Sequence, residues 1–500
     1  MIGRPRLVAG LLAAVLATAA APALADDAAT RPITLADAVA TARAANDAYL
    51  AEVASSDRAA AEARAAAGID DVVVELGADG LTRSIDPVDG PFFQETDLDA
   101  LGARAAVWKP LAWGGRIGVE VGTEVARSTS RIAAGGPVQD ITATIHRPRA
   151  ELVWMQPLLR DRGAAAHQAP RRIAAAGAEA AVALRTLAET GLVRDVTRAY
   201  WELAYAAREV TIRRSALALA EEQLTITRAR AAVGKLPELE VLAVEQAIAA
   251  REAALTGAEQ AAAARALELR VLLALEDGDP RPLAAADALE VDAAPPRNDA
   301  LARALASSPE LRALDHHARA AGVALDAAEA DLRPRLDLVV RGGPIGNAGS
   351  AGDAWAELGR LDGYQATAAL SFSLPVGNRT ARGRRDAARL DRKRLAHDRA
   401  AVRGRLIAEV TRAVDAVTLT ERRIVAAAKA AELARRNVVL EQARWQHGAG
   451  TNFDVLTRQD QAAAADAALA RARAEHRIAI AELAALTGEA AGPPRTPDRG

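Results

Sequence analysis

Apolar side chains recur every seven residues along two long stretches of the chain, residues 164–233 and 380–447. In each stretch a second seven-residue series runs two positions after the first. A seven-residue repeat predicts helices that supercoil against partners, and positions two apart lie about 200° apart around a helix. Each long helix is therefore expected to have neighbours on two nearly opposite sides, as in a closed ring of helices. In the first stretch the two series are Leu203, Val210, Leu217, Leu224 and Ala231, and Tyr205, Ile212, Leu219, Ile226 and Val233.

Between the helical stretches lie four segments with the composition of strands. The clearest alternation is in residues 366–374, where Leu370 and Phe372 alternate with Ser371 and Ser373. A strand with this pattern has one apolar and one polar face. The four predicted strands are residues 72–82, 150–158, 335–343 and 366–374, and further helices are predicted over residues 34–67, 239–275, 297–330 and 452–487.

The chain is an internal duplication. An offset of 214 residues places Val196–Ala199 on Val410–Ala413 and Gly234 on Gly448. An offset of 262 aligns the helices that precede the strands, so the first repeat carries 48 extra residues between about 83 and 150. That extra segment contains a predicted hairpin with its turn at Gly114–Gly115.

The predicted domain organisation follows from these matches. Residues 1–25 have two arginines, an apolar run and an Ala-Leu-Ala end, which predicts a secretory signal peptide cut after Ala25. A first repeat (26–279) follows, with a helical hairpin over 164–275 and its tip at 234–240. A Pro-rich linker (280–296) leads to a second repeat (297–488), with a hairpin over 380–487 and its tip at 448–454. The last predicted part is a disordered tail (489–500).

Composition narrows the function classes. The chain has 63 basic and 65 acidic residues, and loss of the two signal-peptide arginines takes the net charge from −2 to −4, which gives no reason to expect nucleic acid. Acidic and basic residues look interspersed along the chain. Cysteine is absent, which excludes disulfides and thiolate chemistry. No stretch after the signal is apolar enough for a spanning helix, so membrane entry would require a barrel, and four to six strands would need other copies to close it.

The two hairpin tips are the candidate functional site. Each long helix is interrupted by glycine, at Gly234 in GKLPELEVL and at Gly448 and Gly450 in HGAGTNFDVL, and an acid then stands near the start of the returning helix. Glycine permits the turn, and an acid interacts favourably with a helix N-terminus. The acids are Glu240 and Asp454, and simple helix capping is the alternative explanation for both.

These features together resemble the TolC-like outer-membrane efflux protein family over nearly all of the chain after residue 25. The resemblance implies a homotrimer that forms a combined α-barrel and β-barrel tunnel across the periplasm and outer membrane, in contact with lipid. It also implies docking of a periplasmic adaptor and an inner-membrane pump at the tips, here Gly234, Lys235, Leu236, Gly448, Gly450 and Thr451. A pore entrance lined by Glu240 and Asp454 is implied as well, with Trp445 at a gate position; packing is the alternative for Trp445.

Other functions are less well supported. His316 and His317 point about 100° apart on a helix and have no third ligand nearby, so no metal or cofactor is expected. No catalytic constellation stands out, and an enzyme is not expected. A soluble periplasmic coiled-coil scaffold or adaptor is the alternative to an export channel, but the paired strands and the two hairpins favour the channel. The sequence does not indicate the substrate.

Overall fold

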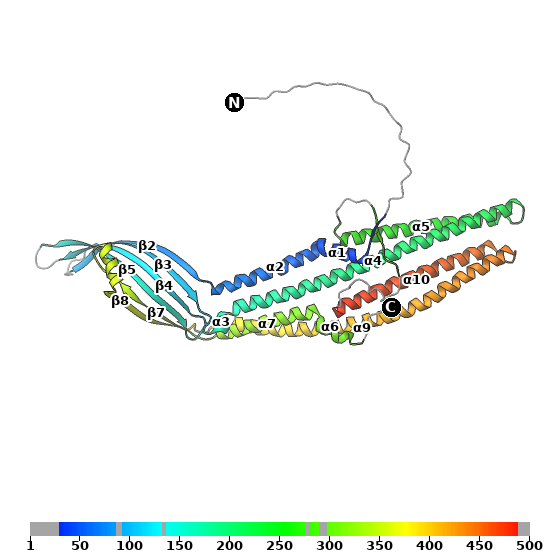
Figure 1. Cartoon of the computed structure of the whole chain (residues 1–500). Helices are drawn as coiled ribbons and strands as arrows, with labels where there is room; N and C mark the ends of the chain where they lie inside the picture. The colour runs from blue at the N-terminus through cyan, green and yellow to red at the C-terminus, as the bar shows by residue number, and fades with distance from the viewer. Residues whose placement is uncertain (1–29, 87–92, 133–136, 276–280, 290–297, 489–500) are drawn as a thin grey trace, which may run out of the picture. The chain divides into compact units, whose positions relative to one another are not determined.

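The computed structural model describes residues 30–86, 93–132, 137–275, 281–289 and 298–488. The predicted signal peptide, the predicted tail and eight of the 17 residues of the predicted linker lie outside these residues. The chain divides into two compact units, one of residues 39–198, 291–425 and 475–500, the other of residues 1–38, 199–290 and 426–474. Helices dominate, with a small sheet part (Figure 1), which confirms the prediction of a mainly helical chain with a small β part.

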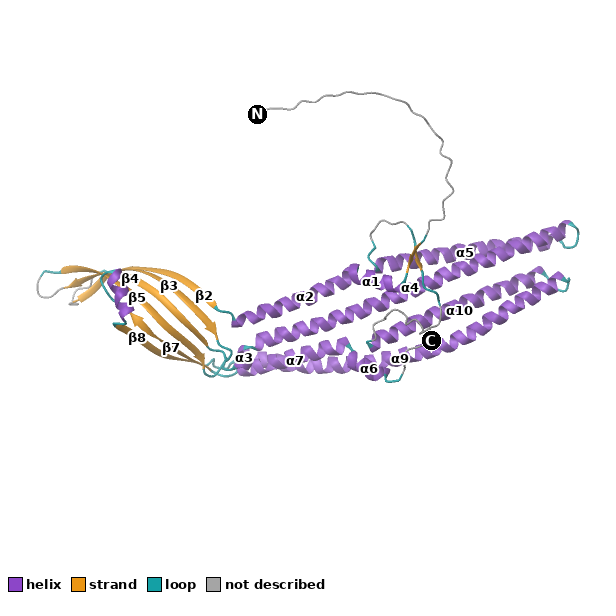
Figure 2. Cartoon of the chain, in the orientation of Figure 1, coloured by secondary structure: helices purple, strands orange, loops and turns teal. Residues whose placement is uncertain are grey.

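The first unit contains a six-stranded antiparallel sheet (Figure 2). Its spatial order is β2-β3-β4-β5-β7-β8, so β2 and β8 are the two edges. The predicted hairpin in the extra segment is confirmed as β3 and β4, with a turn in which the Leu111 amide donates to the Gly115 carbonyl. The strands are β2 (Val73–Ser84), β3 (Phe93–Pro110), β4 (Arg116–Ile132), β5 (Gln139–Pro157), β7 (Arg335–Ile345) and β8 (Gly363–Ser373).

Two predictions for the sheet were wrong in detail. Strand β5 begins at Gln139, not near residue 150, because its first half pairs with β4 from the extra segment. Strand β7 reaches Ile345, two residues beyond the predicted end at residue 343. A Cβ on Gly343 would lie 1.9 Å from the Ala150 carbonyl oxygen, so this glycine allows two backbones to approach closely. Helix α8 (Ala351–Arg360) then connects β7 to β8.

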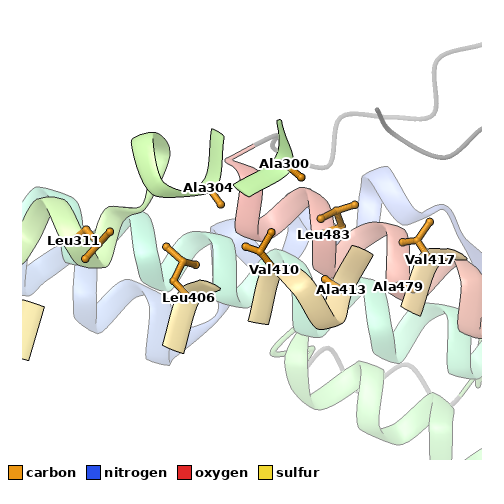
Figure 3. Packing of buried hydrophobic residues seen from close by; sticks show 9 residues of the cluster. All are labelled: Ala300, Ala304, Leu311, Leu406, Val410, Ala413, Val417, Ala479 and Leu483. Carbon is orange, nitrogen blue, oxygen red and sulfur yellow. The ribbon is translucent and has the colours of Figure 1, made fainter. Parts of the chain in front are cut away.

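The helices of this unit are packed through small and aliphatic side chains. Besides α8 and most of α1 (Leu35–Ala45), they are α2 (Asp47–Ala67), the first parts of α4 (Ala169–Ala232) and α9 (Arg379–Gln446), α6 (Ala300–Ser307), α7 (Pro309–Ala330) and the end of α10 (Asn452–Thr487), with the four-residue α3 (Ala164–His167) before α4. Figure 3 shows the core in which Leu406, Val410 and Val417 of α9 meet Leu311 and Leu483. Each fully buried side chain of this size contributes about 1.5–3 kcal/mol.

Two helices predicted as continuous are interrupted. The helix expected over 34–67 ends as α1 (Leu35–Ala45) and resumes at α2, whose N-cap Asn46 accepts a hydrogen bond from the Tyr49 amide. Similarly, Ser308 caps α7 and separates it from α6. One capping residue satisfies the amides of a new first turn while the apolar spacing continues, so the spacing alone did not reveal these breaks.

The second unit is built around the two hairpin ends. It contains the last parts of α4 and α9, α5 (Glu238–Leu272), the first part of α10 and a small parallel pair of strands, β1 (Arg31–Ile33) and β6 (Leu283–Ala285). Residues 283–285 were expected to be linker and are instead a strand. The Tyr200 hydroxyl of α4 donates to Asp287 at 2.7 Å and to the Ile33 carbonyl at 3.1 Å, which attaches both strands to the helix. Burial, and then the hydrogen bond to Asp287, raises the pKa of Tyr200, so its hydroxyl stays a donor.

Among the described helices, none is both long enough and apolar enough to cross a membrane.

Candidate functional site at the hairpin tips

The two tips turn by the same backbone motif. At the end of α4 the Gly234 amide donates to the Ala231 carbonyl and the Lys235 amide to the Arg230 carbonyl. At the end of α9 the Gly448 amide donates to Trp445 and the Ala449 amide to Arg444 in the same pattern. Gly234 and Gly448 have φ of 75° and 77°. This is a Schellman motif with glycine in the left-handed position, which explains why each helix stops at these residues.

Gly450 has a different role from these two glycines. Its φ is not in the left-handed region. A Cβ at this position would lie 2.9 Å from the Glu441 Oε1 atom and 3.4 Å from the Trp445 amide nitrogen. The second glycine of the tip therefore provides room for the buried Glu441 side chain at the end of α9.

The returning helices begin differently in the two repeats. At α10 the Thr451 hydroxyl and the Asp454 carboxylate bond each other at 2.8 Å, and each side chain accepts from the other residue's amide at 3.2 Å. This capping box satisfies two amides of the first turn. The hydrogen bond from the Thr451 side chain, followed by that from its amide, lowers the pKa of the exposed Asp454. Asp454 is thus a cap that stays ionised.

Glu240 has a partner in the other repeat. Helix α5 begins after Pro237, which offers no side-chain cap. The half-buried Glu240 carboxylate accepts a hydrogen bond from the Asn452 amide group at 3.0 Å. Asn452 is fully buried, and its side-chain oxygen accepts from Gln223 at 2.6 Å and from Thr227 at 3.3 Å. A polar network therefore joins the α4–α5 hairpin to the start of α10.

Arg251 of α5 makes the second link between the hairpins. Its Nη1 donates to the Ala216 carbonyl of α4 at 2.7 Å and to Gln459 of α10 at 3.1 Å. Its Nη2 donates to the Leu456 carbonyl at 3.2 Å and lies 2.9 Å from Asp460. The Arg251 side chain is 8% exposed and that of Asp460 is 62% exposed. The guanidinium is therefore held mainly by buried oxygens, with an exposed carboxylate at its edge.

Trp445 lies in the helix packing next to the second tip. Its side chain is 2% exposed, and the Arg230 guanidinium lies 4.0 Å above its ring centre. Arg230 also supplies the carbonyl that closes the first tip. Trp445 thus links the ends of α4 and α9. Of the remaining predicted tip residues, Gly234, Lys235, Gly448 and Thr451 are exposed, and Leu236 and Gly450 are half-buried.

Sequence reasoning missed the residues that hold the hairpins together. Arg251 stands seven residues after Val244 and seven before Ala258, both of which are buried. An arginine inside an apolar seven-residue series was the signal that could have found it. The 214-residue offset places Arg251 on Ala465 in the second repeat. The second repeat therefore has no equivalent of the arginine contact. Asn452 gave no comparable signal, because asparagine at a helix start is ordinary capping chemistry.

The described residues contain no group of three or more His, Asp or Glu side chains able to hold an ion. His316 instead contacts Glu179 through Nδ1 at 2.6 Å, on the helical surface of the other unit.

Comparisons with known proteins place the fold. The sequence model of the outer membrane efflux protein family matches residues 300–489. The chain has no significant match among the curated proteins. Its structure is similar to that of the outer-membrane channel OprN, with 19% identity, a TM-score of 0.64 and coverage of 91% of this chain and 90% of OprN.

Two further solved structures share the fold. The outer membrane protein VceC of Vibrio cholerae has 17% identity and a TM-score of 0.63, over 91% of this chain and 96% of VceC. The outer membrane channel MtrE of Neisseria gonorrhoeae has 18% identity and a TM-score of 0.62, over 91% of this chain and 88% of MtrE. Because each of these structural matches covers 91% of this chain, both repeats and the sheet are included.

Proposed function

We propose that this protein is the outer-membrane export channel of a tripartite efflux or type I secretion system. The proposal is supported by the match of residues 300–489 to the sequence model of the outer membrane efflux protein family. It is also supported by a fold similar to those of solved outer-membrane channels along nearly the whole chain. In this role the protein conducts solutes passively after a periplasmic adaptor and an inner-membrane pump have delivered them. The channel itself catalyses no reaction.

The observation that best supports this proposal is the difference between the two faces of the sheet. Val74, Val107, Val119 and Leu152 pair across the four adjacent strands β2 to β5 and are 65%, 48%, 52% and 55% exposed. An exposed apolar row of this extent is typical of a surface that meets lipid or another protein. One residue further along, the opposite face carries acids on three of the same four strands, at Glu75, Glu120 and the buried Glu151. The same face also holds the buried Trp108 and Val153. One face is therefore apolar and exposed, and the other combines carboxylates with a small apolar cluster.

Oligomerisation follows from the edges of the sheet. Strands β2 and β8 have unpaired backbone groups on one side, and such edges are not tolerated in hydrocarbon. When β2 of one copy pairs with β8 of a second copy, the pair still has one free β8 edge and one free β2 edge. Further copies can add to these free edges until the sheet closes into a ring. We take three copies as the closed assembly, as the resemblance implies.

The tips are the proposed docking site and pore entrance. In a threefold assembly Glu240 and Asp454 place six carboxylates near one opening, and a ring of carboxylates favours cations. The capping bonds of Asp454 do not compete with this role, because they hold its carboxylate in the charged form. Gly234, Lys235, Leu236, Gly448, Gly450 and Thr451 form the adjoining surface for the adaptor.

The acid ring is tested with isosteric amides. Glu240→Gln and Asp454→Asn keep oxygen acceptors for Asn452 and Thr451 but remove the charges. In single-channel recordings the double variant should lose cation preference and sensitivity to trivalent-cation block. A charge-matched control, Asp57→Asn with Glu62→Gln on α2, should leave both unchanged. If the tip variant conducts with unaltered selectivity and block, the two acids have structural roles only, Asp454 as a helix cap and Glu240 as a partner of Asn452.

The channel assignment is tested first by imaging. Protein extracted from the outer-membrane fraction in detergent should appear in negative-stain electron microscopy as threefold particles with one detergent-ringed end. Recovery of the protein without detergent from the soluble periplasm, as rods lacking such a ring, would exclude the channel and identify a soluble scaffold instead.

A further inference from the structure

The apolar face of the sheet ends near the strand ends that lie away from the helices. Residues that pair directly across antiparallel strands point to the same face, so each face can be followed row by row. Along β4 the apolar face carries Ile117, Val119, Val121, Thr123 and Val125. The next row on this face is polar in four adjacent strands, with Thr82, Asp99, Arg127 and Thr144. The apolar band therefore ends at the row of Val125.

This band has nearly the height of the apolar band of a membrane barrel. Val125 follows Ile117 by eight residues, which is about 27 Å along a strand at roughly 3.4 Å per residue. A strand tilt of about 40° reduces this to roughly 20 Å, against about 25 Å in membrane barrels. Thr82 lies near the end of β2, which follows α2, and Thr144 lies near the start of β5, which leads to α3. The polar row is therefore at the end of the sheet remote from the helices.

Helix α8 packs on the apolar face at the level where the band ends. Pro148 lies on this face of β5, and its carbonyl accepts from the Gly346 amide at 2.9 Å. A Cβ on Gly346 would lie 2.0 Å from the Ala354 carbonyl oxygen of α8. Ala348 pairs with His146, which stands in the last apolar row. Figure 2 shows α8 as the short purple helix that runs across the strands, so the helix follows the boundary between apolar and polar rows.

The two flanks of α8 differ in chemistry. Ala354 is fully buried and faces the sheet. At 100° per residue, Trp355 and Leu358 lie on one flank of the helix. The other flank carries Asp353, Glu357 and Arg360. The helix is thus amphipathic along its sides as well as toward the sheet.

Exposed aromatic rings stand at the same level. Trp355 is 43% exposed. Tyr364, at the start of β8 and on the apolar face, is 85% exposed. Tryptophan and tyrosine are favoured where hydrocarbon meets water, because each ring is apolar and also has one polar group. The position of these rings at the end of an exposed apolar band indicates contact with lipid.

Association of copies does not cover this helix. Copies would join through the edge strands β2 and β8, whereas α8 packs against β5 and β7. In a closed ring of strands the apolar face turns outward, and the outward face of such a ring meets lipid. The exposure of Trp355 therefore persists in the proposed assembly.

We propose that α8 is an interfacial helix that lies in the headgroup layer of the membrane, with Trp355 and Tyr364 at the boundary with hydrocarbon. This inference rests on the proposed channel function, because it takes the apolar face of the sheet as the lipid face. An amphipathic helix with a charged flank lies in the plane of the membrane surface. Because the band ends remote from the helices, this layer belongs to the outer leaflet, and α8 fixes the depth of the sheet in the bilayer.

The test uses nitroxide labels on the full-length protein in phosphatidylcholine vesicles. The chain has no cysteine, so each introduced thiol is unique. Trp355→Cys and Arg360→Cys are the matched pair, on opposite flanks of α8. Relaxation of each label is measured with oxygen, which concentrates in hydrocarbon, and with a water-soluble nickel chelate. The oxygen-to-nickel accessibility ratio should be at least about threefold higher at position 355 than at position 360.

A second measurement leaves the native side chain in place. Phosphatidylcholine brominated near the headgroup end of its acyl chains should quench the tryptophan fluorescence of the unsubstituted protein. Trp355→Phe should remove part of this quenching. Trp201→Phe is the control and should leave it unchanged, because Trp201 is 4% exposed in α4.

Three results would overturn the inference. Access of the nickel chelate to both labels would place α8 in water. Access of neither reagent to position 355 would show that another protein surface, such as a second copy, covers the helix. Equal quenching with and without Trp355 would exclude lipid contact even if the cysteine variants fail to fold.

A label at Leu152→Cys separates this inference from the proposed function. Leu152 belongs to the exposed apolar row of the sheet. Oxygen access at position 152 together with nickel access at position 355 would remove only the role of α8. Nickel access at both positions would contradict the lipid face itself, and with it the proposed channel.

Discussion

Glycine at positions 234 and 448 is required by backbone conformation alone. Both residues have positive φ, and a Cβ at either would meet no other atom within 4 Å. We therefore predict that Gly234→Ala and Gly448→Ala each lower the free energy of unfolding by about 1–2 kcal/mol, the cost of a left-handed alanine. Gly257 of α5 is also free of neighbours but is helical. Gly257→Ala should raise stability by about 0.5–1 kcal/mol.

Urea titration in detergent, monitored by helical circular dichroism, measures these differences. Opposite signs for the tip and mid-helix glycines are the expected result. A stabilising effect of alanine at Gly448 would show that the left-handed turn is not the conformation of the second tip.

Asp454 should give the second tip a defined acid sensitivity. Its folded pKa lies below the ordinary value of 3.8 because Thr451 donates to the carboxylate. A depressed folded pKa contributes stability that is complete above the unfolded pKa and is lost as the pH falls through the folded pKa. The difference in melting temperature between the parent protein and Asp454→Asn should thus be constant above about pH 5 and shrink below pH 3.8. A difference that already disappears near neutral pH would contradict the capping geometry.

At the scale of elements, the contact between Arg251 and Asp460 allows the stability contributed by buried hydrogen bonds to be compared with that contributed by an exposed ion pair. Arg251→Met keeps the apolar stem but leaves the Ala216 and Leu456 carbonyls and Gln459 without their donor. We expect a loss of roughly 2–3 kcal/mol, because buried acceptors lose charged hydrogen bonds. Asp460→Asn should cost less than about 1 kcal/mol, because that carboxylate is exposed and screened.

Thermal unfolding of both variants provides the comparison, and limited proteolysis near residues 234 and 448 localises the effect. Similar losses in the two variants would mean that the ion pair, and not the carbonyl contacts, holds the hairpins together.

The elements show how far the sequence is informative. Seven-residue spacing predicts long helices because the same packing contact recurs after every two helical turns. The glycines predict both hairpin tips because few other residues adopt positive φ. The spacing does not register capping residues such as Asn46. The prediction for β5 was too short because residues 83–150 were treated as an extra segment, although Ile141, Ala143 and Ile145 alternate there with polar residues. Arg251 was overlooked because an amphipathic side chain in an apolar series resembles an ordinary exposed position until its carbonyl partners are known.

At the scale of the whole molecule, the edges of the sheet make the assembly testable. Three copies would close the six-stranded sheet into a cylinder of eighteen strands, a number that leaves an aqueous lumen. Because the chain has no cysteine, engineered thiols report only on the intended contact. We predict that Leu76→Cys in β2, combined in separate variants with Ala366→Cys, Ala368→Cys or Leu370→Cys in β8, forms disulfides between copies for at least one register.

The cross-linked ladder on denaturing gels should stop at three chains, because a closed ring leaves no free edge for a fourth. Leu76→Cys combined with Leu338→Cys in β7 is the control, since β7 is paired on both sides within its own chain and should form no bond between copies. A ladder that continues beyond three would indicate open edge-to-edge association. Absence of cross-links in every register would exclude pairing of β2 with β8, and with it the closed lumen on which conduction depends.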